Sequence, residues 1–261
     1  MLIDTHCHLD AAEFGDTQAD LVQTAQAVGV ARIVIPSVAR NNFDAVRTLC
    51  ERFPNCSPAY GIHPMYTVDS MPSHLDAMRK YIQQHRPIAV GEIGMDFFVK
   101  GYDPDQQEFF FVRQLELARE FDLPVLLHIR HAQDVVLKNL RQHKVRGGIA
   151  HAFNGSKQQA EEFIKLGFKL GFGGAMTYPR AARLHKLAAT LPLESIVLET
   201  DAPDIPPSFL ERGQPNKPEY LPRIAQMLAD LRSMTLEEVA QATTANVMIV
   251  LPELNTPVIP A

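Results

Sequence analysis

Short apolar segments alternate with longer segments of helical periodicity along the chain. The apolar segments predict eight strands, at residues 2–8, 32–37, 57–62, 88–94, 124–130, 148–153, 168–173 and 196–201. Apolar residues three and four positions apart predict helices at residues 17–28, 42–52, 72–85, 104–121, 132–143, 157–166, 180–190, 218–231 and 236–247. Several predicted strands are apolar on both faces, which is typical of parallel strands that helices cover.

Eight strand–helix units in 261 residues predict an α/β fold, a (β/α)8 TIM-type barrel. No linker or low-complexity segment divides the sequence, so we expect a single domain over residues 1–261. A doubly wound open sheet is the alternative. It fits less well because no glycine-rich phosphate-binding loop follows the first predicted strand.

Six side chains that can bind a metal lie at or near the carboxyl ends of five predicted strands. They are His6, His8, Glu92, His128, His151 and Asp201. In a barrel these strand ends surround one mouth, so we expect the six side chains to meet there. They can hold one divalent cation with water, or two cations that share a carboxylate. A single histidine at a strand end is more often structural, but independent structural histidines have no reason to gather at one end. Asp4 has the same parity as His6, so it could support a metal ligand or be a hydrogen-bonded residue near the barrel floor, and we favour the second interpretation.

Seven short motifs resemble those of the TatD family of metal-dependent hydrolases, within the wider metal-dependent amidohydrolase group. They are DTHCHLD at residues 4–10, GIHP at 61–64, GEIGMD at 91–96, LPVLLHIR at 123–130, HAFNG at 151–155, LETDAP at 198–203 and NKP at 216–218. The first motif alone is shared across the amidohydrolase group, whereas the ordered set is specific. The resemblance implies a barrel with a divalent-metal centre, and it carries the metal-ligand role onto the same six residues.

The resemblance further implies a phosphoester hydrolase, often a deoxyribonuclease, that uses two divalent ions, Zn²⁺, Mn²⁺ or Mg²⁺. The fifth strand carries His128 and no metal-bridging lysine, which favours Glu92 as the shared ligand over the carbamylated lysine of some related amidohydrolases. Two features depart from the family pattern. Ala152 and Asn154 stand where family members commonly have Cys and Ser, and Asn154 is expected to alter contacts with the substrate. Residues 246–251 lack the usual Arg-Leu-Phe ending, which we interpret as altered helix packing.

Asp201 and Glu92 are the predicted catalytic residues. Metal ions lower the pKa of bound water and so supply a hydroxide that attacks the ester. We predict that Asp201 orients this water and takes its proton. Arg130 is a candidate phosphate clamp, with pairing to Asp134 or to another acidic residue as the alternative. His63 is a candidate substrate contact or auxiliary acid, with a structural role in capping the loop as the alternative.

The net charge and the number of cysteines indicate how a substrate would be bound and in which compartment the protein works. The chain has 25 basic and 30 acidic residues, a net charge of −5, whereas proteins that hold long nucleic acid over their whole surface are usually basic. We therefore expect a nucleic-acid or small phosphoester substrate to be held locally at the metal site. The three cysteines, Cys7, Cys50 and Cys56, suit a reducing compartment. Without a signal-peptide pattern or an apolar run of about 18 residues, we expect a cytoplasmic location, no membrane contact and no obligate protein partner.

Two other functions compete with phosphoester hydrolysis. The same metal centre can serve a carboxylic ester or amide hydrolase, including one that cleaves aminoacyl esters, because fold and ligands do not separate these reactions. A non-catalytic metal-dependent binding protein is the third possibility, and the presence of every expected ligand argues against it.

Overall fold

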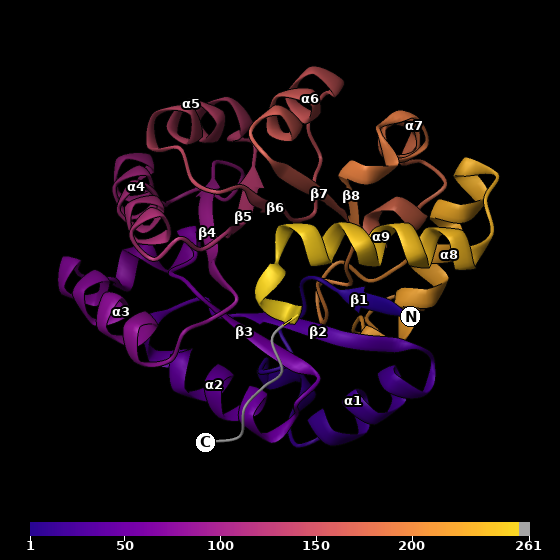
Figure 1. Cartoon of the computed structure of the whole chain (residues 1–261), viewed down its shortest axis with the longest axis horizontal. Helices are drawn as coiled ribbons and strands as arrows, with labels where there is room; N and C mark the ends of the chain where they lie inside the picture. Colours follow the sequence, from indigo (N-terminus) through magenta and orange to yellow (C-terminus); the bar gives the residue numbers. More distant parts are fainter. Residues whose placement is uncertain (256–261) are drawn as a thin grey trace.

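The computed structural model describes residues 1–255, in which eight parallel strands form a barrel surrounded by helices (Figure 1). The strands are β1 (Leu2–Asp4), β2 (Val30–Pro36), β3 (Cys56–Tyr60), β4 (Ala89–Asp96), β5 (Val125–Arg130), β6 (Gly148–Ala150), β7 (Phe168–Phe172) and β8 (Ile196–Leu198). Each strand pairs in parallel with the next one in sequence. The predicted (β/α)8 barrel is confirmed. The predicted domain limits of 1–261 extend over residues 256–261, which lie outside the described residues.

Nine α-helices lie within residues 1–255, and each begins and ends within three residues of a predicted helix. They are α1 (Gln18–Ala27), α2 (Phe43–Arg52), α3 (Pro72–Gln84), α4 (Pro104–Glu120), α5 (Gln133–His143), α6 (Lys157–Lys165), α7 (Ala182–Thr190), α8 (Leu221–Arg232) and α9 (Leu236–Val250). In this described part, no helix is both long and apolar enough to cross a membrane.

Helix α9 lies across the amino-terminal end of the barrel, on the face turned toward the viewer in Figure 1. Val247 and Val250 of α9 pack into one buried cluster with barrel residues such as Ile3 and Val34. Asn246 donates from Nδ2 to the carbonyl oxygens of Leu193 and Ile196, each at 2.8 Å. These two bonds attach α9 to the start of β8. With this end covered, the opposite end forms the accessible mouth.

Three strands end three or four residues earlier than predicted from the sequence. β1 ends at Asp4 rather than at residue 8, β6 at Ala150 rather than at 153, and β8 at Leu198 rather than at 201. Hydrophobic alternation does not show where ladder pairing stops, because the chain beyond these strands stays buried. Ala152 and Asp201 have φ angles of +44° and +61°, which turn the chain out of the strand direction.

The barrel closes through the segments that follow β1 and β8. The N–H of Thr5 donates to the carbonyl of Leu198 at 3.2 Å, and the N–H of His8 donates to the carbonyl of Ala202 at 2.8 Å. An isolated parallel bridge joins Cys7 to Ala202 between these two bonds. Two segments that carry predicted ligands, one following β1 and one following β8, therefore lie side by side at the seam.

Candidate metal centre

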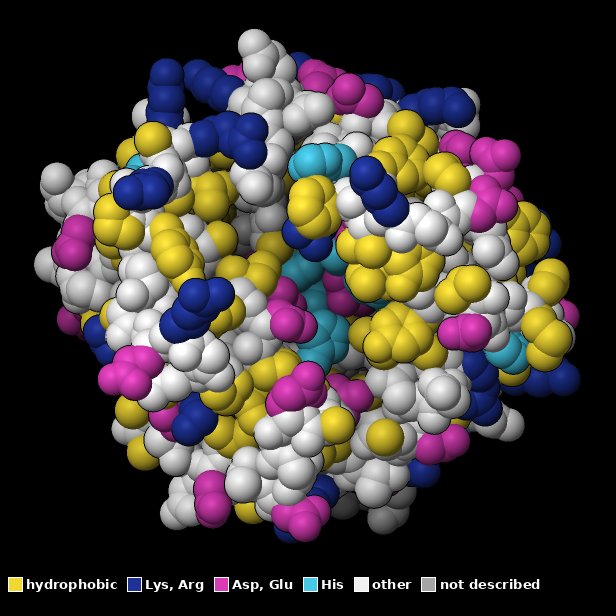
Figure 2. Space-filling model, turned by 180° about the vertical axis from the view of Figure 1, so that it is seen from behind, with side chains coloured by type: hydrophobic (Ala, Val, Ile, Leu, Met, Phe, Trp, Pro, Cys, Tyr) yellow, Lys and Arg dark blue, Asp and Glu magenta, His cyan; other side chains and the backbone are white. Residues whose placement is uncertain are grey.

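The predicted site residues meet at the carboxyl-terminal end of the barrel. Figure 2, which views the face opposite to that of Figure 1, shows imidazole and carboxylate side chains inside a central hollow. The cavity there has a volume of about 790 Å³. His8, Glu92, His128, His151, Asp201 and the two predicted substrate contacts, His63 and Arg130, all line it. His6 lies beneath them and is fully buried.

Four of the six predicted ligands lie beyond strand ends rather than within strands. His6 and His8 follow β1, His151 follows β6, and Asp201 lies three residues beyond β8. The prediction that His6 and His8 share one face of a strand is therefore wrong, because neither residue lies in a strand. Their rings still converge, with 3.3 Å between the two Nε2 atoms.

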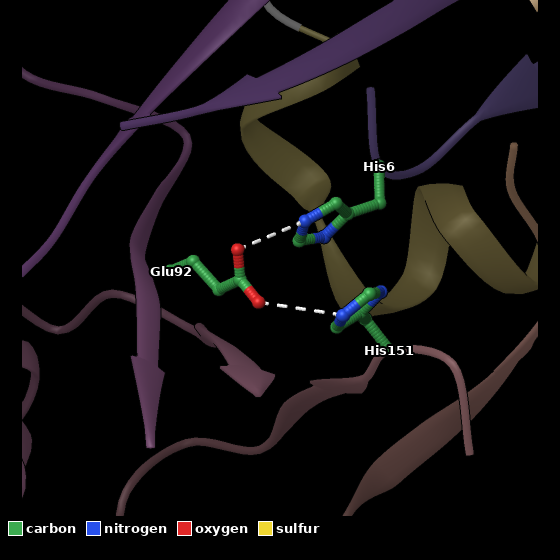
Figure 3. A group of neighbouring side chains, drawn as sticks. All are labelled: His6, Glu92 and His151. Atoms are coloured by element: carbon green, nitrogen blue, oxygen red, sulfur yellow. Dashed lines mark hydrogen bonds and ion pairs between the residues drawn. The ribbon is translucent and has the colours of Figure 1, made fainter. Parts of the chain in front are cut away.

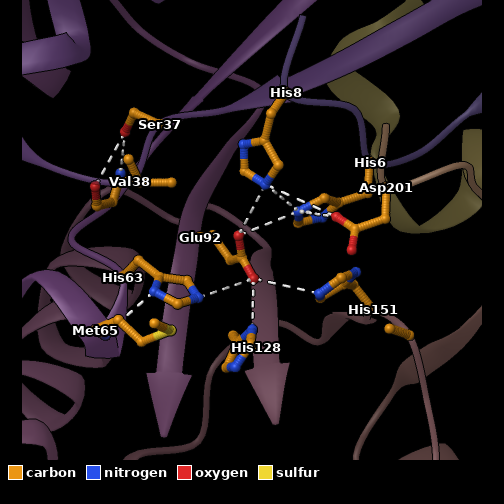
Figure 4. Close-up of polar contacts among 12 residues, drawn as sticks. His6, His8, Ser37, Val38, His63, Met65, Glu92, His128, His151 and Asp201 are labelled. Carbon is orange, nitrogen blue, oxygen red and sulfur yellow. Dashed lines mark hydrogen bonds and ion pairs between the residues drawn. The ribbon is translucent and has the colours of Figure 1, made fainter. Parts of the chain in front are cut away.

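One oxygen of Glu92 faces a first group of donors. Glu92 Oε2 lies 3.2 Å from His6 Nε2 and 3.5 Å from His8 Nε2 (Figure 4). Asp201 Oδ1 lies 3.7 Å and 3.8 Å from the same two nitrogens. Ligands bound about 2.0–2.2 Å from a tetrahedral ion are about 3.3–3.6 Å apart, so these spacings suit one shared ion.

The other oxygen of Glu92 faces a second group. Glu92 Oε1 lies 3.0 Å from His128 Nδ1, 3.3 Å from His151 Nε2 and 3.6 Å from His63 Nε2. Figure 3 shows the carboxylate between the His6 and His151 rings, with a different oxygen directed at each. Each Glu92 oxygen therefore faces its own group of imidazoles, and the two groups meet where the His6 and His151 rings stack with their centroids 3.9 Å apart.

Glu92 is charged in this environment. Its side chain is 2% exposed, and burial alone would raise its pKa. The imidazoles of His6, His63 and His151, together with the hydrogen bond to His128, outweigh burial and hold the pKa of Glu92 well below its usual range. A buried carboxylate enclosed by nitrogen donors is the kind of donor set that binds zinc, and it also accommodates other divalent ions.

Asp96 fixes which nitrogen of His128 faces Glu92. Asp96 Oδ2 lies 3.0 Å from His128 Nε2, and Asp96 Oδ1 accepts from the N–H groups of Phe98 and Val99. Burial would raise the pKa of Asp96, but these hydrogen bonds and the His128 ring lower it to about 2. The carboxylate therefore accepts a hydrogen bond from His128 Nε2, and His128 Nδ1, 3.0 Å from Glu92 Oε1, is the nitrogen that could bind a metal in place of its proton.

In His63 it is Nε2, and not Nδ1, that faces Glu92. Its Nδ1 accepts a hydrogen bond from the N–H of Met65 at 3.2 Å, and burial lowers its pKa to about 3. The ring is therefore neutral, with its only N–H on Nε2, 3.6 Å from Glu92 Oε1. His63 thus presents its Nε2–H, a proton donor, to the site.

Arg130 ends β5 and is exposed at the rim of the cavity. Its guanidinium carbon lies 3.7 Å from the ring centroid of Phe98, so the cation stacks on this aromatic side chain. The alternative partner, Asp134, instead accepts a hydrogen bond from Gln159. Arg130 is therefore available to an anion that enters the mouth.

Asp4 and Asn216 anchor the segment that carries Asp201. Asp4 accepts hydrogen bonds from the N–H groups of His6 and Thr200 and from Thr200 Oγ1. Burial raises the pKa of Asp4 to about 7, against the effect of these bonds. Asn216 Nδ2 donates to the carbonyl of Thr200 at 2.7 Å. Asn216 is the first residue of the motif at residues 216–218, but its role could not be inferred from the sequence.

The sequence profile described as "TatD related DNase" matches residues 3–251. The chain belongs to the TatD family. Among curated relatives, the TatD homologue YjjV of Escherichia coli K12, an "uncharacterized metal-dependent hydrolase", is 43% identical over 254 residues, which cover 94% of this chain and 95% of YjjV. The human deoxyribonuclease TATDN3 is 29% identical over 270 residues, covering 97% and 96% of the two chains.

Solved structures of TatD-family proteins have the same fold as this chain. The crystal structure of E. coli YjjV superposes with a TM-score of 0.93 and 38% identity, covering 98% of both chains. A TatD-family hydrolase from Entamoeba histolytica superposes with a TM-score of 0.84 at 20% identity, covering 100% of this chain and 98% of that one, and so supports the fold alone. This chain is a metal-dependent hydrolase of the TatD family.

Proposed function

We propose that this chain hydrolyses phosphodiester bonds, in DNA or in small phosphoesters, with two divalent ions that Glu92 bridges. The observation that carries the proposal is the division of donors between the two Glu92 oxygens. One ion would be held by His6, His8 and Asp201, and the other by His128 and His151. The ions are Zn²⁺, Mn²⁺ or Mg²⁺, and a deoxyribonuclease among the relatives supports the nucleic-acid substrate.

When bound, such ions acidify water and polarise the phosphoryl oxygen. Asp201 is the carboxylate best placed to orient the attacking water and take its proton. Its side chain is 11% exposed and lines the cavity, whereas Glu92 is 2% exposed and has imidazoles against both oxygens. We therefore assign the general-base role to Asp201. Glu92 acts in catalysis by holding the two halves of the centre together.

His63 and Arg130 are the proposed substrate contacts. The Nε2–H of His63 lies inside the cavity and can donate to a phosphate oxygen or to the leaving oxygen. Arg130 is at the rim, and its guanidinium can bind a phosphate with two parallel hydrogen bonds.

A cytoplasmic location is part of the proposal. Cys7, Cys50 and Cys56 are buried free thiols, as expected of a protein kept in a reducing compartment.

The test is a parallel assay of metal-stripped protein reloaded with Zn²⁺, Mn²⁺ or Mg²⁺. The substrates are a labelled single-stranded DNA oligonucleotide, bis-p-nitrophenyl phosphate and p-nitrophenyl acetate. We expect metal-dependent cleavage of the phosphodiesters that a chelator stops, and an Asp201→Asn protein prepared in parallel excludes a contaminating nuclease. Hydrolysis of the carboxylic ester alone would instead support the carboxylic ester hydrolase and contradict the proposal.

A further inference from the structure

Glu199 is a buried carboxylate for which the proposed reaction has no use. It directly follows β8 and is 1% exposed. Its Oε1 accepts a hydrogen bond from the N–H of Ala152 at 2.5 Å. Its Oε2 has no hydrogen-bond partner among the described residues. Burying a carboxylate with half of its hydrogen bonds unmade is costly, so this position needs a compensating interaction.

The His151 ring provides the neighbouring donor. His151 Nδ1 lies 3.4 Å from Glu199 Oε1, and it too has no hydrogen-bond partner within the described part of the chain. The other ring nitrogen, Nε2, lies 3.3 Å from Glu92 Oε1. The imidazole therefore lies between two carboxylates, one at each nitrogen.

Two glycines, Gly171 in β7 and Gly173 just after it, leave room for the Glu199 side chain. A Cβ atom on Gly171 would overlap Glu199 Oε2 and would lie 2.7 Å from Cδ. A Cβ on Gly173 would lie 3.3 Å from Glu199 Cγ. Gly171 does not have a left-handed φ angle, so its backbone conformation does not require glycine. Glycine is required at this position because the Glu199 side chain fills the space that a Cβ atom would need.

We propose that Glu199 is a positioning residue for His151, because its carboxylate accepts the Nδ1–H and so keeps the Nε2 lone pair directed at the metal. A neutral imidazole has one N–H, and histidine ligands usually donate that proton to an acceptor behind them. Asp96 serves His128 in the same way with the two nitrogens exchanged. The inference rests on the proposed metal centre and adds the residue that orients one of its ligands.

A purely structural role for Glu199 makes a different prediction. Ala152 has a left-handed φ of +44°, and the bond from its N–H to Glu199 holds the chain where it leaves β6. If this were the only role, removing the carboxylate would change folding stability but not the environment of His151 Nδ1. The test therefore reads out metal affinity and that nitrogen separately.

The experiment uses full-length metal-stripped protein titrated with Zn²⁺ against a chelating dye. We compare Glu199→Met, which removes the acceptor, with Glu199→Gln, which keeps an acceptor oxygen. Gly171→Ala displaces the carboxylate without removing it. Glu194→Gln is the matched control, because it removes an exposed carboxylate at the opposite end of β8. We expect Glu199→Met and Gly171→Ala to bind Zn²⁺ about 10–100-fold more weakly, Glu199→Gln to lose less, and the control to lose nothing.

NMR of zinc-loaded protein labelled with ¹⁵N-histidine provides the second readout. The Nδ1 proton of His151, assigned by its absence in His151→Asn, should resonate downfield in the wild type and move upfield in Glu199→Met. If it does not move, Glu199 only supports Ala152 and the inference is overturned, even where zinc affinity falls. Wild-type affinity in both Glu199→Met and Gly171→Ala overturns it as well. A wild-type chain that binds no divalent ion would overturn the metal centre itself, which distinguishes the two failures.

Discussion

Neutralising Glu92 should weaken both metal positions at once. Glu92→Gln keeps the shape of the side chain but removes the charge that its two oxygens present to the two groups of imidazoles. Two unit charges about 4 Å apart contribute about 4 kcal/mol at an effective dielectric constant of about 20, and each ion carries two charges. Even after part of this is offset by desolvation, we expect a loss of at least about 3 kcal/mol for each ion, or more than about 100-fold in Kd.

Elemental analysis and calorimetric titration of metal-stripped protein measure this loss. The wild type should bind two ions per chain, and Glu92→Gln should retain neither at the free metal concentration that saturates the wild type. Arg130→Ala is the comparison, because its side chain borders the cavity without approaching Glu92. Thermal unfolding of both metal-free variants checks that they are folded. Glu92→Gln protein that still binds two ions with wild-type affinity would refute the bridging role.

Three further predictions test other parts of the site and of the core. Asp201→Asn should lower kcat by about 10²–10⁴-fold at saturating metal, and recovery of wild-type kcat there would limit Asp201 to a ligand role. Arg130→Ala should keep its metal and lose about 10–100-fold in kcat/KM for phosphodiesters, so a lost ion would contradict its assignment to the substrate. Burial raises the pKa of Cys7 and Cys50, and it raises that of Cys56 to about 12. All three thiols should therefore resist Ellman's reagent near pH 8 until the chain is unfolded, and a fast-reacting thiol in native protein would be the contrary result.

The pattern of apolar residues predicted the barrel because each strand and each helix carries its own local periodicity. The predicted ends of β1, β6 and β8 are wrong for a physical reason. Ala152 and Asp201 have left-handed φ angles that no apolar pattern encodes, and the segment after β1 bonds alternately to two different neighbours. The convergence of the six predicted ligands required no knowledge of these details, since topology alone brings the strand ends together.

The finer organisation of the site could not be predicted from the sequence. Which Glu92 oxygen faces which imidazole depends on side-chain rotamers, and so does the choice of Nδ1 or Nε2 in His128 and His63. The partners that decide these choices are also distant in sequence. Asp96 lies 32 residues from His128. The residues at 171 and 199 meet only because β7 and β8 are neighbours. The glycine on β7 is visible in the sequence, but it indicates only that space is needed there and not which side chain fills that space.

The barrel seam couples the proposed metal centre to closure of the fold. His6 and His8 come from the first residues of the chain, and Asp201 comes from the segment after the last strand. The N–H of Asp201 donates to the carbonyl of His6 at 2.8 Å, so the bond that closes the barrel also joins two ligands of the same proposed ion. Asp4 strengthens the same junction through its hydrogen bonds to Thr200. A chain with an open seam would hold its donors on two separate segments, so metal affinity at this position depends on closure of the whole barrel.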